Sequence, residues 1–160
     1  MDSLRQHVVA LLRGGQAYDS FDSVVDEFRH EERWVVPPGA ERSAWQIVEH
    51  MQRALRDILD FCQNESGTYI ERDWPADYWP TSSSPIKGAW EDTINAYKVD
   101  LAEMEALVQD DSRDLFKQFP WGEGQTLLRE ALLAADHASH HLGQLIELKR
   151  WIDATPMPKR

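Results

Sequence analysis

The chain has 160 residues, of which 42% are hydrophobic and 28% are charged, and its formal net charge at pH 7 is −11. These proportions are ordinary for a globular protein, and the length suits one domain spanning residues 1–160 with a sizeable core. Because an acidic surface repels phosphate groups, the charge argues against binding to nucleic acid and against binding to anionic membranes.

Other sequence features bear on the cellular compartment. No stretch approaches the roughly 20 apolar residues of a membrane span, and the N-terminus opens into an amphipathic pattern without a secretory h-region. The single cysteine, Cys62, cannot form an internal disulfide. We therefore expect a cytoplasmic protein in a reducing environment.

The first half of the chain predicts two helical regions. The first covers residues 3–28 and is broken at the Gly14-Gly15 pair, because paired glycines destabilise a helix interior. After a proline-rich loop, Ser43 and Gln46 have the spacing of a capping box, which starts the second helix. The apolar residues of that helix recur at helical spacing: Ile47, Met51, Ala54, Ile58 and Phe61.

Residues 63–87 form a long predicted loop with three prolines and an aromatic cluster that includes Trp74, Tyr78 and Trp79. Loops of this length are often functional, although aromatic side chains also pack at the open end of a bundle simply to bury surface. The third helix follows, with apolar residues alternately four and three apart, as in a bundle seam. These residues are Trp90, Ile94, Tyr97, Leu101, Met104 and Val108.

A fourth helix is expected at residues 126–152, with Thr126 as its N-cap. It is apolar on two sides, so it must be covered on two sides, either by the N-terminal segment or by a second subunit. We favour the second subunit, and hence a homodimer. One side holds Leu127, Leu133, Ala134, Leu145, Leu148 and Ile152, and the other holds Leu128, Leu132, Ala135, Leu142 and Ile146. The predicted fold class is all-α, a four-helix bundle with extra short helices.

Three histidines carry the strongest chemical signal. His137 and His141 are four residues apart on the inward face of the fourth helix, so they can bind one metal ion together. A third histidine, His50, lies at the edge of the inward stripe of the second helix. Three imidazoles with open coordination positions are typical of a catalytic metal centre. The alternative is three packed core histidines, which would need other partners because burying an unpaired polar group costs roughly 1–3 kcal/mol.

Other titratable groups are weaker candidates. His140 points about 60° from His137 and about 100° from His141 around the helix, so we expect it to be exposed and outside the metal site. Glu130 lies about 10 Å below His137 on the inward face; a salt bridge is favoured for it over a role as base. Cys62 lies about 120° from His50 around the second helix, which argues against a cysteine–histidine nucleophile. The sequence assigns no acid–base residue.

Five segments, in this order, resemble the DinB-like superfamily over nearly the whole chain. They are residues 45–50 (WQIVEH) with 56–61 (RDILDF), residues 73–80 (DWPADYWP), residues 124–131 (GQTLLREA), and residues 136–144 (DHASHHLGQ). The ordered set is far more specific than any one segment.

The resemblance implies a four-helix bundle with a divalent metal, commonly zinc or nickel, held by three histidines at one end. Carried over by motif, these are His50, His137 and His141. Characterised relatives include bacillithiol transferases and mycothiol-dependent maleylpyruvate isomerases, and homodimers are frequent. Close relatives often have a histidine just before the Ser-x-Trp of the second helix; here Glu41 and Arg42 precede Ser43, so a role of that histidine cannot be transferred.

The resulting functional hypothesis is a metal-dependent enzyme that acts on a small-molecule substrate. It would be a thiol S-transferase or a hydrolase, with the metal activating either a low-molecular-weight thiol or a water molecule. The alternative hypothesis is a non-enzymatic metal- or ligand-binding stress-response protein that has kept the site without turnover.

Overall fold

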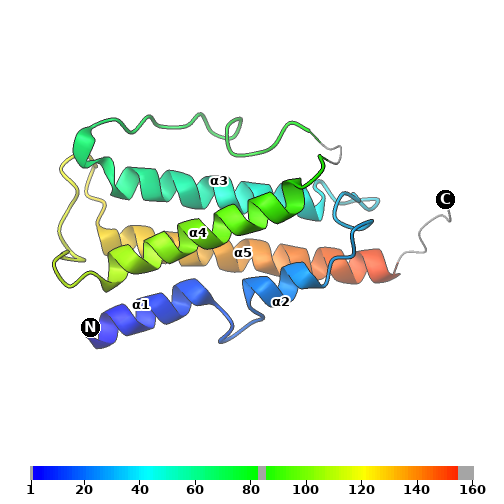
Figure 1. Cartoon of the computed structure of the whole chain (residues 1–160), viewed down its shortest axis with the longest axis horizontal. Helices are drawn as coiled ribbons and strands as arrows, with labels where there is room; N and C mark the ends of the chain where they lie inside the picture. Colours follow the sequence, from blue (N-terminus) through cyan, green and yellow to red (C-terminus); the bar gives the residue numbers. More distant parts are fainter. Residues whose placement is uncertain (1, 83–85, 155–160) are drawn as a thin grey trace.

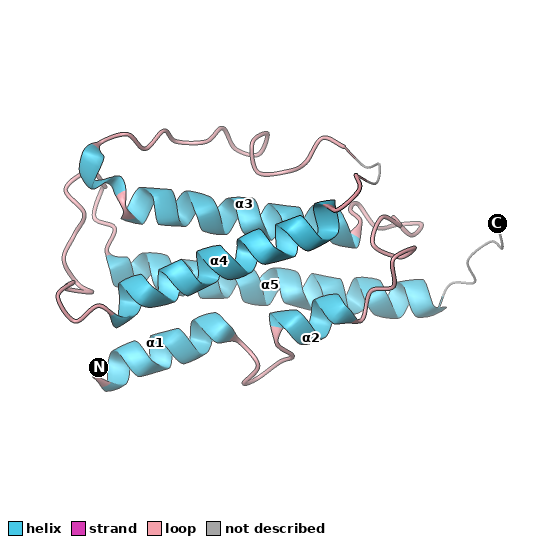
Figure 2. Ribbon diagram, in the orientation of Figure 1, coloured by secondary structure: helices cyan, strands magenta, loops and turns pink. Residues whose placement is uncertain are grey.

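The computed structural model describes residues 2–82 and 86–154. Within these residues all the regular secondary-structure elements are helices (Figure 1 and Figure 2). In chain order the helices are α1 (Ser3–Arg13), α2 (Phe21–Asp26), α3 (Ala44–Cys62), the 3₁₀ turn η1 (Asn64–Ser66), α4 (Ala89–Gln109) and α5 (Leu127–Ala154). None of the helices in the described part is long and apolar enough to cross a membrane.

The predicted four-helix bundle with extra short helices is confirmed. In Figure 1, α1 and α2 lie end to end and together take the place of one helix beside α3, α4 and α5. Helix α1 packs against α4 and α5, α2 packs against α5, and α3 packs against both α4 and α5. The long connection between α3 and α4 runs back along the outside of α3 (Figure 1). Residues 83–85 of this connection lie outside the described residues.

The predicted helix boundaries have local causes that the structure confirms. Gly14 and Gly15 have φ angles of 66° and 70°, a region that favours glycine and ends α1. Ser43 and Gln46 form the capping box: Ser43 Oγ accepts from the Gln46 backbone at 3.3 Å, and Gln46 Oε1 accepts from the Ser43 backbone at 3.0 Å. Thr126 Oγ1 accepts from the Arg129 backbone at 3.2 Å, so Thr126 caps α5 as expected.

The apolar patterns of α3 and α4 predict only part of the core: Val48, Leu55 and Leu59 of α3 are buried although the predicted stripe did not include them, and Ile94 and Leu101 of α4 are only half-buried. The most deeply buried apolar side chains include Val48, Met51, Leu59, Met104, Val108 and Leu145. Ile58 and Phe61, which were expected in the inward stripe of α3, are only half-buried. They line a cavity between α3 and α5 and therefore keep contact with solvent.

The two apolar sides of α5 have different surroundings. Ala135 and Leu142 on the second side are buried, and both α1 and α2 pack against this helix. The expectation that Leu133 faces the core is wrong: its exposed fraction is 37%, because it borders the open cavity between α3 and α5. Leu132 is also exposed, at 43%. The second subunit stays a prediction.

Candidate metal centre

The structure brings the three predicted histidines together. His50 comes from α3, and His137 and His141 come from successive turns of α5, which packs beside α3. Nε2 of His137 lies 3.0 Å from Nε2 of His50 and 3.1 Å from Nε2 of His141. His50 and His141 are buried and His137 is half-buried. Among the histidine, cysteine, aspartate and glutamate side chains that the structure describes, these three form the one cluster whose ligand atoms are close enough to hold a metal ion together.

Hydrogen bonds on the far sides of two rings define their tautomers. Nδ1 of His50 lies 3.0 Å from the carbonyl oxygen of Tyr78, which can only accept, so Nδ1 carries the proton. Nδ1 of His141 lies 2.7 Å from Oε1 of Gln144, which also accepts. The amide nitrogen of the same glutamine donates to Nε2 of His140 at 3.0 Å. In both buried rings Nε2 therefore keeps an unshared electron pair aimed at the centre.

This donor set fits a divalent metal ion. Electron pairs that face one another at about 3 Å repel unless a cation or a proton lies between them. At a metal–nitrogen distance of about 2.1 Å, two ligands at right angles would be about 3.0 Å apart and two at the tetrahedral angle about 3.4 Å apart. The observed separations of 3.0 and 3.1 Å agree with adjacent ligands of one ion. Three histidines leave further positions open for water or a substrate.

Burial keeps these histidines in the form that binds metals. It lowers the pKa of His137 to about 3, and the neighbouring His141 lowers this pKa further within that shift. It lowers the pKa of His141 to about 4. Burial also lowers the pKa of His50. At neutral pH all three imidazoles are therefore uncharged and need lose no proton to bind a cation.

The aromatic loop between η1 and α4 forms one wall of the centre. The ring of Trp79 stacks on His50 with 3.9 Å between centroids and an angle of 5° between planes. Arg53 Nη1 donates to the backbone carbonyls of Asp77 and Trp79 at 3.2 and 3.4 Å, so α3 holds the loop in place. Trp74 is 67% exposed and contributes less to this wall.

The sequence analysis missed the anchor of this loop, which is Asp57. The hydroxyl of Tyr78 donates to Asp57 Oδ2 at 2.5 Å, and the hydroxyl of Tyr69 donates to Oδ1 at 3.3 Å. The side chain of Arg72 makes an ion pair with the same carboxylate at 3.5 Å. Asp57 lies two turns beyond His50 on α3, and this spacing of seven residues is the signal that could have placed it on the same face.

Among the remaining titratable candidates, His140 and Glu130 have the surroundings that were expected. His140 is exposed. Glu130 is buried and pairs with Arg129 at 2.7 Å, and burial raises the pKa of its carboxyl group. Cys62 is fully buried, and burial raises the pKa of its thiol, so it is no nucleophile in the folded protein.

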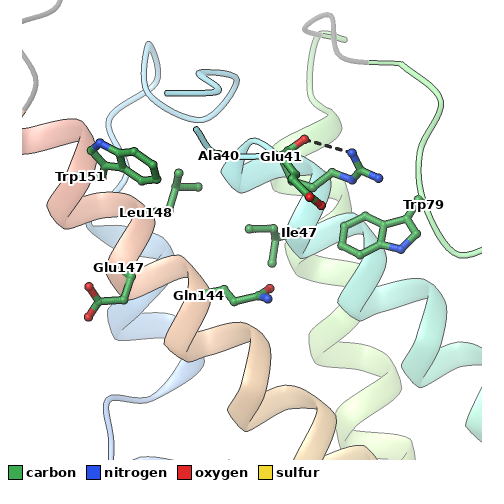
Figure 3. Close-up of a pocket in the computed structure, with 9 residues that line it drawn as sticks. Ala40, Glu41, Ile47, Trp79, Gln144, Glu147, Leu148 and Trp151 are labelled. Carbon is green, nitrogen blue, oxygen red and sulfur yellow. Dashed lines mark hydrogen bonds between the residues drawn. The ribbon is translucent and has the colours of Figure 1, made fainter. Parts of the chain in front are cut away.

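A cavity of about 440 Å³ lies near the histidine cluster, and Figure 3 shows the residues that line it. Two of its lining residues also touch the cluster: Trp79 stacks on His50, and Gln144 bonds to His141. The complete lining is Ala40, Glu41, Arg42, Ile47, Trp79, Gln144, Glu147, Leu148 and Trp151. The cavity is large enough for a small molecule and is separated from the histidine rings by Trp79 and Gln144.

Comparison with known proteins identifies one similarity. The model of a protein family described as the DinB superfamily matches residues 4–145 of this chain. No curated protein matches the chain, and no solved structure does.

Proposed function

The chain belongs to the DinB superfamily, and we propose that it is a metal-dependent enzyme acting on a small molecule. In this proposal His50, His137 and His141 bind a divalent ion, zinc or nickel. The reaction is the transfer of a low-molecular-weight thiol, or a hydrolysis at the same site. The observation that carries the proposal is the convergence of three Nε2 atoms with separations of 3.0 and 3.1 Å.

The residues around the histidines support catalysis rather than a closed structural site. When bound, zinc or nickel supplies a Lewis acid that lowers the pKa of a coordinated thiol or water. The Tyr78 carbonyl and the Gln144 amide hold two rings with their electron pairs inward. Trp79 shields one face of His50 from water, and the cavity beside it leaves room for a substrate.

The first experiment measures metal content. Wild-type protein without an affinity tag, purified and analysed by elemental mass spectrometry, is expected to hold zinc or nickel at close to one ion per chain. His50→Ala, His137→Ala and His141→Ala should each lose it. His140→Ala is the matched control, because His140 is an exposed neighbour on the same helix, and it should keep the metal. Wild-type protein that stays free of metal after incubation with excess zinc or nickel would refute the proposal.

A second experiment separates the enzyme from the alternative, a metal-binding protein without turnover. Metal-loaded protein is supplied with a thiol and an electrophile, and consumption of the electrophile is followed. Saturable turnover that His137→Ala abolishes supports the transferase. A protein that holds its metal but turns over neither thiols nor hydrolysable esters would be the non-enzymatic binder.

The family resemblance also supports a homodimer. Light scattering coupled to gel filtration tests this directly: a mass of one chain, about 18.5 kDa, would contradict it. Exposed Leu132 and Leu133 on α5 are available for such a contact.

A further inference from the structure

A second cavity, of about 670 Å³, lies between α3 and the start of α5. We propose that it binds an organic ammonium ion with an apolar body, and that Glu130 pairs with the charged nitrogen. The volume falls within the range of roughly 300–1,000 Å³ that small-molecule sites occupy. None of the three histidines of the candidate metal centre lines it. Asp57 on α3 lies seven residues beyond His50. Glu130 on α5 precedes His137 by the same number, which is about 10 Å along a helix. The inference therefore concerns a separate site and goes beyond the proposed function.

Part of the lining is apolar and aromatic. Ile58 and Phe61 of α3 are half-buried and Leu133 of α5 is 37% exposed, and all three border this cavity. The rings of Tyr69 and Trp121 also line it, and Tyr69 packs edge-on against Phe61 with 5.6 Å between centroids. An apolar ligand body would cover the aliphatic side chains, and aromatic faces attract an ammonium group. A bare metal ion would gain nothing from this surface, so we infer an organic cation.

The charged part of the lining is acidic. Carboxylates outnumber the single lining guanidinium, that of Arg129, four to one. The four carboxylates are those of Asp57, Glu71, Glu123 and Glu130. Arg72 pairs with Asp57 at 3.5 Å from outside the lining, and the acidic groups still exceed the cations by two. The cavity therefore attracts a cation and repels an anion.

Glu130 is the buried carboxylate whose partners are incomplete. Its exposed fraction is 3%. Arg129 Nη1 donates to Oε1 at 2.7 Å, and Oε2 has no partner among the residues that the structure describes. Asp57, by contrast, accepts from two tyrosine hydroxyls and pairs with Arg72. Burial raises the pKa of Glu130, and the charge of Asp57 adds to this. An ammonium group beside Oε2 would supply the missing donor and reduce the repulsion between the two carboxylates.

Contacts within the protein hold the aromatic part of the lining in place. Trp121 Nε1 donates to the backbone carbonyl of Phe61 at 2.8 Å, which joins the loop before α5 to the end of α3. The ring of Trp121 stacks on Phe119 with 5.2 Å between centroids. The backbone of Phe119 in turn donates to the carbonyl of Gln125 at 2.9 Å, which closes the loop on itself. A site held in this way binds a ligand with less loss of conformational entropy.

The test is a heteronuclear NMR titration that follows the indole N–H signals of the tryptophans, with the Trp121 signal assigned by its loss in Trp121→Phe. Three ligands of similar size are compared: phenethylamine, its uncharged counterpart phenethyl alcohol, and the anion phenylacetate. Wild-type protein is expected to bind the amine about tenfold more tightly than the alcohol, the gain of a charged hydrogen bond, and the Trp121 signal should shift. In Glu130→Gln this preference should disappear while the affinity for the alcohol stays unchanged. Glu130→Asp, which keeps the charge, should retain part of the preference.

The matched control is Glu147→Gln, because Glu147 is a glutamate on the same helix that pairs with a neighbouring arginine but lies outside this cavity. It should bind the amine like wild type. His137→Ala should do the same, since the site is separate from the histidine cluster. An unchanged preference in Glu130→Gln would overturn the inference, as would wild-type protein that binds the alcohol or phenylacetate as tightly as the amine. Loss of amine binding in His137→Ala, or a Trp121 signal that does not shift with phenethylamine, would overturn it too. None of these outcomes bears on the metal content that tests the proposed function.

Discussion

The backbone carbonyl of Tyr78 accepts a hydrogen bond from Nδ1 of His50 at 3.0 Å, and the hydroxyl of this tyrosine donates to Asp57 at 2.5 Å. One loop residue thus touches α3 at two points, two turns apart. The first contact orients a histidine of the candidate metal centre, and the second fixes the loop that makes that contact. Stability of the loop and geometry of the centre are therefore coupled through Tyr78.

Replacing Asp57 tests this coupling. Asp57→Asn removes the carboxylate that accepts from Tyr69 and Tyr78 and pairs with Arg72. We expect a loss of about 1–3 kcal/mol in the free energy of unfolding, because the hydroxyl donors of two half-buried tyrosines lose a charged acceptor. Chemical denaturation measures the loss, and limited proteolysis should show faster cleavage within residues 67–82. Asp60→Asn, an exposed neighbour paired with Arg56, is the control. Equal destabilisation by both variants would contradict the anchoring role of Asp57.

Gln144 should tune the metal affinity without being a ligand. In Gln144→Leu, Nδ1 of His141 loses its acceptor, and the ring is free to turn or to change tautomer. Loss of such an outer partner typically weakens metal binding by about 10- to 100-fold, and we expect the lower end because Gln144 is exposed. Competition with a chromophoric chelator measures the affinity, with Glu147→Gln one turn further along α5 as the control. An affinity within about twofold of wild type would show that Gln144 does not orient His141.

Cys62 should be unreactive in the folded protein. It is fully buried, and burial raises the pKa of its thiol, so the thiolate that reacts with alkylating reagents is scarce. Between about pH 7 and pH 9 the native protein should be alkylated by iodoacetamide far more slowly than a free cysteine, whose pKa is near 8.5. Denaturant should restore the ordinary rate. Rapid modification of the native protein, followed by mass spectrometry, would mean that the end of α3 opens readily.

Alanine substitutions at Gly39 and Gly67 distinguish the cost of a steric contact from the cost of backbone strain. Both have positive φ angles, 93° and 69°, but a Cβ on Gly39 would meet Trp151 at 2.9 Å whereas one on Gly67 would meet nothing within 4 Å. Gly67→Ala should cost about 1 kcal/mol, from strain alone. Gly39→Ala should cost about 1 kcal/mol more, because the ring of Trp151 must move. Thermal unfolding compares the two variants. An equal loss of stability in both variants would show that residues 37–42 move away from Trp151 at no measurable cost.

Much of the fold could be predicted because its signals are local. The glycine pair after α1, the capping box at Ser43 and the hydroxyl cap at Thr126 each act through contacts within a few residues. The apolar repeat of α4 likewise predicts which side is buried. Leu133 was placed wrongly because its exposure depends on a cavity formed with α3, which no repeat within α5 can reveal.

For the candidate metal centre, the sequence by itself determined that His137 and His141 share a helix face, since four residues complete about one turn. The apolar pattern of the second helix placed His50 at the edge of its inward stripe, and the motif resemblance gave the same three histidines. Only the tertiary structure decided that His50 on α3 meets the pair on α5, and which ring nitrogen of each histidine faces the centre. It also decided that Tyr78, Asp57 and Gln144 support the cluster. These relations join residues up to 87 positions apart. They depend on how the helices and the long loop pack, and packing is set by the whole chain rather than by any local pattern.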